Sequence, residues 1–204
     1  MQVRRLYFFL IRILRPIVCL IFPIRIYGTE HIPSQGKVIL CSNHKSVLDP
    51  FFLAMRCPRH IHYMAKSELF TDHGRIAKWF LYKMGAFPVH RGTGDAESVH
   101  NALQLLENNA LVGIFPQGGC VRNKDTSFQP KAGAVLIAAK AKADILPACI
   151  YSQGRIRPFH RVTIRYGKMI PFSSLAITGT SSRECRIGAK KVADEICRLL
   201  EERY

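Results

Sequence analysis

His44 and Asp49, five residues apart, are the pair of side chains in this sequence best suited to proton transfer. They follow residues 38–41 (VILC), an apolar run typical of a buried strand, and ligand sites of α/β proteins gather at the carboxyl ends of such strands. Five residues correspond to about 140° on a helix, so the two side chains can meet only through a loop or a helix start. A carboxylate on one imidazole nitrogen would fix the tautomer and leave the other nitrogen as a base for a hydroxyl group.

The same two residues also admit a purely structural interpretation. Asp is a common N-cap and Pro a common first helical residue, so Asp49-Pro50 could simply start a helix while His44 bonds a loop carbonyl. Cys41 and Ser46 flank the histidine as candidate nucleophiles, but Cys41 ends an apolar run, where nothing lowers the pKa of a thiol. The residues alone leave both interpretations of the pair open.

Strand and helix patterns alternate along the part of the chain that carries this pair. Apolar runs predict strands at 38–41, 61–64, 111–115, 145–150 and 162–166, with Pro147 making the fourth an edge or irregular strand. Helical periodicity is present near 76–84, 99–106, 132–139 and 192–200, the second after a favourable N-cap at Asp95. We therefore predict a single α/β domain with a largely parallel or mixed sheet flanked by helices.

The net charge and amino-acid composition limit which classes of partner such a domain could bind. The 204 residues carry a formal net charge of +16, which favours an anionic partner such as phospholipid, nucleotide or nucleic acid. Hydrophobic residues at 48% and charged residues at 22% exclude a disordered chain and a coiled coil.

Cysteine and histidine usage argues against metal and disulfide chemistry. The seven cysteines are an odd number without a C-x-x-C pair, so we expect a reducing compartment, no zinc site, and packing roles for the thiols. His60 and His62 alternate on a predicted strand, but no suitably spaced carboxylate or cysteine accompanies them. No metal site is expected.

The amino-terminal segment is apolar from residue 6 to 24, yet it contains Arg12, Arg15, Pro16 and Pro23, which disfavour a spanning helix. On a helical projection the arginines at 4, 5, 12 and 15 share about a quarter of the circumference, opposite an apolar face formed by residues 6, 9, 10, 13 and 14. We interpret residues 1–27 as a membrane anchor lying in the headgroup plane, followed by an α/β domain at 28–204. A signal peptide and a helix that merely covers the core are the alternatives.

Four blocks resemble a known family. Asn43-His44-x-x-x-x-Asp49 is similar to the N-H-x-x-x-x-D block of the glycerolipid acyltransferases, whose best-known members are 1-acylglycerol-3-phosphate acyltransferases. Residues 85–91 (GAFPVHR) resemble the second motif, with Arg91 on its arginine, and residues 115–119 (FPQGG) resemble the third, F-P-E-G-T-R. Residues 145–148 (ILPA) resemble the fourth. The blocks keep the family's order over residues 28–151.

The resemblance implies acyl transfer from coenzyme A or acyl carrier protein, as co-substrate, to the free hydroxyl of a lysophospholipid, with no cofactor and no acyl-enzyme. His44 would be the general base, Asp49 would orient it, and Arg91 would hold the acceptor phosphate. Asn43 and Gln117 are the supporting motif residues. The most direct expectation is acylation of 1-acylglycerol-3-phosphate to phosphatidate at the cytoplasmic face of a membrane, by a peripheral or monotopic enzyme.

The third block departs from the family. Gln117 replaces Glu, Gly119 replaces Thr and Cys120 replaces Arg, so a role that needs negative charge at position 117 is lost. We expect Arg122 and Lys131 to supply cations instead, and the amides of Gly118 and Gly119 to approach phosphate or an oxyanion. These departures leave open a different lysolipid or hydroxylated lipid as acceptor, and a catalytically silent lipid-binding relative. A nucleic-acid binder is not expected, because only charge favours it.

Overall fold

The computed structural model describes residues 2–90, 95–121, 130–175, 177 and 179–202. Its centre is one seven-stranded sheet in the order β1-β7-β6-β2-β5-β3-β4. The strands are β1 (Ile24–Tyr27), β2 (Val38–Ser42), β3 (Ile61–Lys66), β4 (Phe87–Val89), β5 (Leu111–Ile114), β6 (Asp144–Tyr151) and β7 (Val162–Tyr166). All neighbours are parallel except β6 and β7, so the predicted mixed α/β sheet is confirmed.

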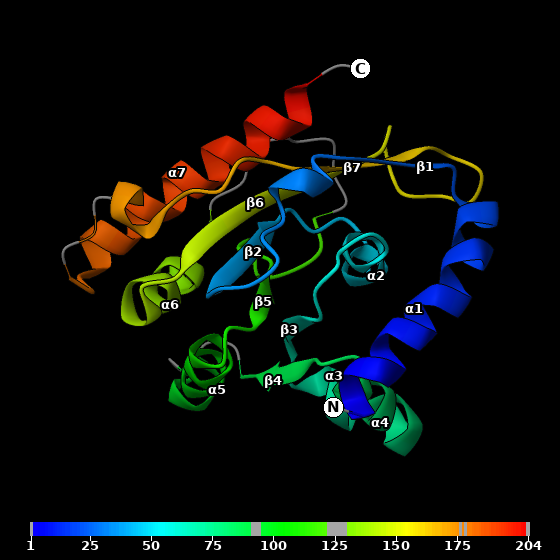
Figure 1. Cartoon of the computed structure of the whole chain (residues 1–204), viewed down its shortest axis with the longest axis horizontal. Helices are drawn as coiled ribbons and strands as arrows, with labels where there is room; N and C mark the ends of the chain where they lie inside the picture. Colours follow the sequence, from blue (N-terminus) through cyan, green and yellow to red (C-terminus); the bar gives the residue numbers. More distant parts are fainter. Residues whose placement is uncertain (1, 91–94, 122–129, 176, 178, 203–204) are drawn as a thin grey trace.

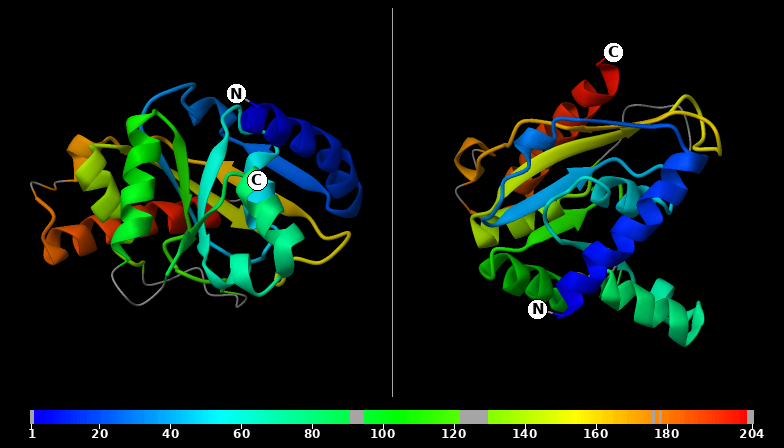
Figure 2. Two further views of the ribbon diagram at one scale, coloured as in Figure 1. Left: turned by 90° about the horizontal axis from the view of Figure 1, so that it is seen from below. Right: turned by 45° about the vertical axis from the view of Figure 1, so that its right-hand side comes forward.

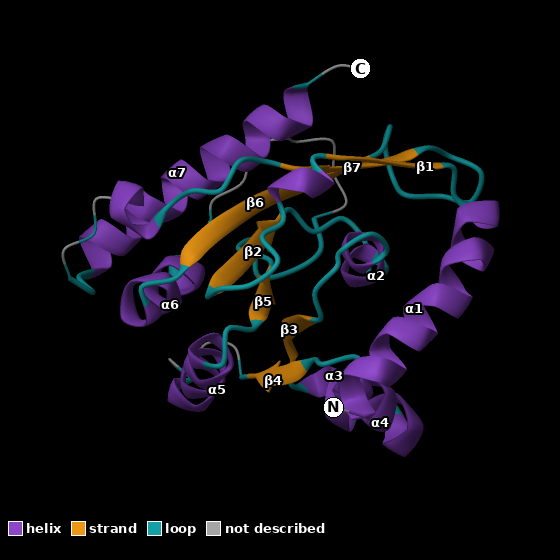
Figure 3. Cartoon of the chain, viewed as in Figure 1, coloured by secondary structure: helices purple, strands orange, loops and turns teal. Residues whose placement is uncertain are grey.

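Helices cover both faces of this sheet, as Figures 1 and 3 show. The helices are α1 (Gln2–Ile21), α2 (Asp49–Ala54), α3 (Glu68–Thr71), α4 (Gly74–Lys83), α5 (Ala96–Glu107), α6 (Gly133–Ala141) and α7 (Ser182–Glu201), with short 3-10 turns at Thr29–His31 and Phe172–Leu175. One core cluster joins the sheet to α5, α6 and α7, and the other joins it to α1 and α2. Because both faces are covered, the central strands are apolar throughout, as the buried VILC run of β2 illustrates.

Local signals in the sequence explain where helices begin. Asp95 caps α5 by accepting the amide of Ser98 at 3.0 Å, as the sequence predicts. The apolar face of α7 buries Val192, Ile196 and Leu199 at the predicted spacing. Helix α4 forms where predicted, but its apolar residues are not buried, and Ile76 is 84% exposed.

The prediction that Pro147 makes its strand an edge strand is wrong, whereas the predicted irregularity is present. Strand β6 lies between β2 and β7, and Pro147 pairs with Cys41 of β2. On the side of β6 that pairs with residues 163–170, the register shifts by one residue between Ile145↔Ile170 and Ala148↔Tyr166. Within a strand, the backbone nitrogen and carbonyl of one residue face the same side. The Pro147 carbonyl accepts the Gly167 amide, so the Pro147 nitrogen, which carries no hydrogen, also faces this bulge.

The amino-terminal segment shares a core with the rest of the chain. Tyr7, Ile11 and Phe22 are buried against the sheet, and β1 is the edge strand beside β7. The opposite side of α1 stays outside: Phe9, Ile13, Ile17 and Leu20 are all about half exposed or more. Helix α1 therefore covers the core with one face and presents a second apolar face outward.

Helix α4 contacts α1 and projects past the edge of the sheet beside the start of α1 (Figure 2). None of the described helices has the length and apolar character needed to cross a bilayer.

Candidate active site

His44 and Asp49 meet directly after the central strand β2. The loop between β2 and α2 folds back so that His44 Nδ1 lies 2.9 Å from Asp49 Oδ2. Asp49 is completely buried, whereas the His44 side chain keeps 16% of its surface exposed. An ionised carboxylate only accepts, so Nδ1 carries the proton and, in the neutral ring, Nε2 is left as the acceptor.

The carboxylate of Asp49 organises the whole turn. Oδ2 also accepts the backbone amides of Lys45 at 2.5 Å and Ser46 at 2.8 Å, whereas Oδ1 is buried without a hydrogen-bond partner among the described residues. The alternative in which Asp49 caps its helix is wrong, because α2 begins with Asp49 itself and no side chain caps it. The carboxylate instead points back across the loop at the imidazole.

Asn43 ties this loop to the sheet. Its side-chain amide donates to the carbonyl of Ile150 at 2.9 Å and its oxygen accepts the amide of Ile150 at 2.8 Å. Asn43 is buried, and this two-point contact fixes the chain next to His44 against the carboxyl end of β6. The supporting role expected of Asn43 is therefore to hold the backbone of this loop to β6.

The imidazole is held in plane by aromatic rings from β3 and the end of β5. Phe115 stacks on His44 with ring centroids 4.1 Å apart and 15° between planes, and Tyr63 stacks on Phe115 with centroids 5.8 Å apart. The Tyr63 hydroxyl donates to the Pro50 carbonyl at 3.0 Å. These contacts restrict the ring to the orientation that Asp49 selects.

The loop that follows β5 binds the backbone of His44 at both ends. Gln117 Oε1 accepts the His44 amide at 2.5 Å, and the Val121 amide donates to the His44 carbonyl at 2.7 Å. An amide oxygen performs the first contact without charge, so the loop docks although the family's carboxylate is absent. Gln117 is thus placed as a support of His44.

Of the two glycine amides predicted to approach phosphate or an oxyanion, that of Gly118 is already bonded within the protein. The Gly118 amide donates to the Phe115 carbonyl at 2.9 Å, which closes a turn with Gly118 at φ +71°. The expectation that this amide approaches a ligand is therefore wrong, because it is already bonded. The Gly119 amide has no partner among the described residues. The side chain of Lys131 lies against Gly118, because a Cβ added to Gly118 would come 2.8 Å from Lys131 Nζ.

Two predicted cations fall outside the part of the chain that the structure describes. Arg91 and Arg122 are not among the described residues, so their expected contacts with an acceptor phosphate stay predictions. Lys45, beside the catalytic pair, donates from Nζ to the Ser152 carbonyl at 3.1 Å, and burial lowers the pKa of its ammonium group despite the opposing charge of Asp49.

Sequence reasoning missed Cys120. Its sulfur lies 3.2 Å from His44 Nε2, and the residue is exposed, so the expectation that every cysteine is a packing residue is wrong here. The substitution of the family's arginine by a thiol was visible in the sequence, but the proximity of this thiol to a histidine 76 positions away was not. Cys41, by contrast, is buried, and burial raises the pKa of its thiol to about 12.

The described ranges hold no group of three or more His, Cys, Asp or Glu side chains that could bind a metal ion. The His60 ring lies 4.2 Å from the His62 ring and 4.0 Å from the ring of Tyr7 on α1, between centroids, and is tilted against both. His60 therefore packs directly against α1.

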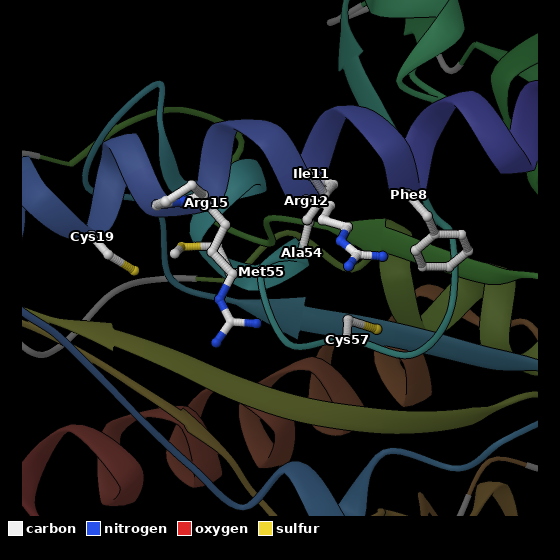
Figure 4. Close-up of a pocket in the computed structure, with 9 residues that line it drawn as sticks. Phe8, Ile11, Arg12, Arg15, Cys19, Ala54, Met55 and Cys57 are labelled. Atoms are coloured by element: carbon white, nitrogen blue, oxygen red, sulfur yellow. The ribbon is translucent and has the colours of Figure 1, made fainter.

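A cleft of about 380 Å³ lies at the other end of α2 from Asp49. It lies between α1 and residues 54–57, with Arg12 and Arg15 on the α1 side and an apolar surface that includes Phe8, Ile11 and Met55 (Figure 4).

Comparison with known proteins gives a consistent result. A family model described as Acyltransferase matches residues 23–151. A 1-acyl-sn-glycerol-3-phosphate acyltransferase of Bacillus subtilis is 34% identical over 147 residues, which are 70% of each chain. One of Streptococcus pneumoniae is 30% identical over 86% of this chain and 66% of its own length. The crystal structure of the Thermotoga maritima 1-acyl-sn-glycerophosphate acyltransferase PlsC superposes with a TM-score of 0.67 at 20% identity, covering 89% of this chain and 73% of that one.

Proposed function

Because the chain belongs to the acyltransferase family and is an O-acyltransferase, we propose that it moves a fatty acyl group from a thioester donor to the free hydroxyl of 1-acylglycerol-3-phosphate. The acceptor is the one named for the relatives from Bacillus and Streptococcus. The observation that carries the proposal is the 2.9 Å contact between His44 Nδ1 and buried Asp49 Oδ2, which leaves Nε2 as the basic nitrogen of an accessible ring.

In this reaction His44 removes the proton of the acceptor hydroxyl as its oxygen attacks the acyl carbonyl. The ring then becomes an imidazolium, and the negative charge of Asp49 stabilises that charge from the opposite side. The imidazolium returns the proton to the departing thiolate. Coenzyme A or acyl carrier protein supplies the acyl group as co-substrate, and the residues in this scheme call for no further cofactor.

We assign the acceptor phosphate to the loop that follows β5, near Gly118 and Gly119. Lys131 lies against Gly118, and the Gly119 amide adds a donor without a described partner. We also assign Arg91 to this phosphate, because it falls on the arginine of the second motif. We assign Arg122 to it as a nearby replacement for the arginine that the third motif lacks at Cys120. A lysine and a backbone amide suit a phosphate monoester, because both donate to its anionic oxygens.

The outward face of α1 supports docking on an anionic membrane. Phe9, Ile13, Ile17 and Leu20 form an apolar stripe, and the arginines at 4, 5, 12 and 15 flank it, two of them at the cleft beside α2. The net charge of +16 adds attraction to anionic lipid. We assign residues 1–27 to this docking role and the enzyme to the cytoplasmic face of a membrane as a peripheral or monotopic protein.

An acyl-transfer assay tests the reaction. Purified protein is given palmitoyl-CoA or palmitoyl acyl carrier protein with lysophosphatidate, and in parallel with lysophosphatidylglycerol or lysophosphatidylcholine. We expect phosphatidate as the main product, and a loss of about 10²- to 10⁴-fold for His44→Ala because the general base is gone. His100→Ala, an exposed histidine on α5, is the matched control and should keep wild-type activity. If another lysolipid were preferred, the proposed acceptor would be wrong. If none of them gave a product, the proposed reaction itself would be rejected.

Membrane docking is tested by substitution, since deletion of α1 would also remove core residues. The double variant Ile13→Gln, Ile17→Gln should weaken co-sedimentation with phosphatidylglycerol vesicles by about 30-fold, because two half-exposed isoleucines contribute about 2 kcal/mol when buried in lipid. Ile187→Gln, on the exposed side of α7, is the control. Equal sedimentation of both variants would contradict the docking role of α1.

A further inference from the structure

A thiol, an imidazole and a carboxylate stand in a row at the active site. Cys120 Sγ lies 3.2 Å from His44 Nε2, and His44 Nδ1 lies 2.9 Å from Asp49 Oδ2. Nucleophilic catalysis needs this order: a nucleophile within reach of a base whose second nitrogen is oriented by an acceptor. The general-base reaction described above uses only the second and third members.

The backbone fixes the thiol at this position. The His44 amide donates to Gln117 Oε1 and the Val121 amide donates to the His44 carbonyl, so the loop is bonded to the backbone of His44 on both sides of Cys120. The Phe115 ring stacks on the imidazole from the start of the same loop. The Gln117 side chain, the Val121 amide and the ring stack therefore hold the backbone on both sides of Cys120 close to His44.

Other cysteines lack this setting. Cys41, Cys57 and Cys149 are buried, and burial raises the pKa of each thiol, to about 12 for Cys41 and about 11 for the other two. Thiolates are the reactive form, so these three are poor nucleophiles. Cys120 is exposed and adjoins a base that can take its proton.

The thiol also lies where an acceptor hydroxyl would have to bind. A general base removes a proton from a group within about 2.6–3.2 Å, and Cys120 already lies at the far end of that range from Nε2. A hydrogen bond from the Cys120 thiol to Nε2 occupies the lone pair that would accept the proton of a hydroxyl group. Acylation of the sulfur would remove its proton and free Nε2 for the acceptor.

We propose that Cys120 is the nucleophile of a two-step transfer and carries the acyl group as a thioester before the acceptor receives it. In the first step His44 takes the Cys120 proton, the sulfur attacks the donor carbonyl, the carbonyl-to-sulfur bond of the donor breaks, and the departing thiolate recovers the proton. In the second step His44 takes the proton of the lysophospholipid hydroxyl, its oxygen attacks the acyl-Cys120 carbonyl, and the cysteine thiolate leaves and is reprotonated.

The first step exchanges one thioester for another of the same bond type, and the second forms an oxygen ester while restoring the free thiol, so the cycle needs no oxidant or further reactant. Asp49 serves both steps, because each forms the same imidazolium. This inference rests on the proposed acyl transfer and adds a covalent intermediate to it.

The test is to trap the intermediate. Full-length protein is incubated with palmitoyl-CoA or palmitoyl acyl carrier protein without acceptor, and intact mass spectrometry then measures covalent acylation. We expect about one acyl group per chain, located at Cys120 by peptide mapping, released by neutral hydroxylamine and discharged by added lysophosphatidate. Cys120→Ala and His44→Ala should give no adduct, whereas Cys19→Ala, an exposed cysteine on α1, should label as wild type does.

Kinetics separate a chemical role of Cys120 from a structural one. Wild-type rates at varied donor and acceptor should show ping-pong behaviour, and Cys120→Ser should keep the fold but form an oxygen ester that resists neutral hydroxylamine. Full activity of Cys120→Ala with no wild-type adduct would overturn the covalent step and leave the acyltransferase function standing. Absence of both adduct and product with either donor would reject the reaction itself and the covalent step with it.

Discussion

Replacing Asp49 by Asn isolates the charge of the buried carboxylate from its geometry. All three hydrogen bonds to this side chain end on Oδ2, and Oδ1 has no partner among the described residues. An asparagine with its carbonyl oxygen at the Oδ2 position keeps all three bonds and places its amino group where an unpartnered oxygen already lies. The turn from Lys45 to Ser46 is therefore expected to survive the substitution.

The lost charge should appear in the rate. His44 becomes cationic during the reaction while its Nδ1 lies 2.9 Å from Asp49 Oδ2. Two unit charges about 4 Å apart interact by about 4 kcal/mol at an effective dielectric constant of about 20. Each 1.36 kcal/mol is a factor of ten in rate, so kcat/KM should fall by about 10³-fold. The ground state, with a neutral ring, should lose much less.

The measurement is kcat/KM for phosphatidate formation by wild type and Asp49→Asn, with urea unfolding of each to confirm the fold. Asp144→Asn is the matched control, because its carboxylate also accepts a backbone amide, that of Phe172, but lies at the start of β6, away from His44. We expect wild-type kcat/KM for this control. A folded Asp49→Asn enzyme within tenfold of wild type would refute the charge argument.

Three further predictions test the packing around the site. Ile11→Ala should lower the free energy of unfolding by about 2–4 kcal/mol in urea titrations, because the side chain is buried in the core beneath α1. Burial, with a smaller contribution from His62, lowers the pKa of His60 from 6.5 to about 4, so the unfolded chain binds a proton that the folded protein excludes, and stability falls as the pH drops from about 6.5 toward 4. His60→Phe should remove about 2 kcal/mol of that pH dependence, a figure discounted for partial exposure. Gly85→Ala should cost more than about 2 kcal/mol, because φ is +80° and the new Cβ would lie 2.3 Å from His60 Nε2, whereas Gly74→Ala, at φ +77° with open space around it, should cost only about 1 kcal/mol.

Each of these substitutions has a result that contradicts its reasoning. Unchanged stability of Ile11→Ala would mean that α1 does not pack on the core in solution. A His60→Phe protein with the same stability loss between pH 6.5 and 4 would assign that loss to other groups. Equal costs for Gly85→Ala and Gly74→Ala would show that the contact with His60 adds nothing to the strain at positive φ.

The fold was largely predictable because its signals are local. Buried strands such as β2 and the periodic face of α7 follow from side-chain spacing, and the Asp95 cap depends on an amide three residues away. The strand with Pro147 was expected to be an edge strand or an irregular one. It is irregular but not at an edge, because a missing N–H can also be accommodated at a bulge inside a sheet. Pairing partners are distant in sequence, so periodicity does not reveal them.

At the active site, the sequence determined that His44 and Asp49 lie five residues apart after a predicted strand, near enough to meet through a turn. Their contact also depends on Asn43, which holds this loop to β6. The sequence also determined that residues 2–21 form a helix with apolar and basic faces. Only the tertiary structure decided which apolar face of that helix packs on the core and which stays outside. Only the tertiary structure set Cys120 beside His44, because that contact joins the ends of two parallel strands, and sheet register, which depends on the packing of the whole core, decides which loops meet there.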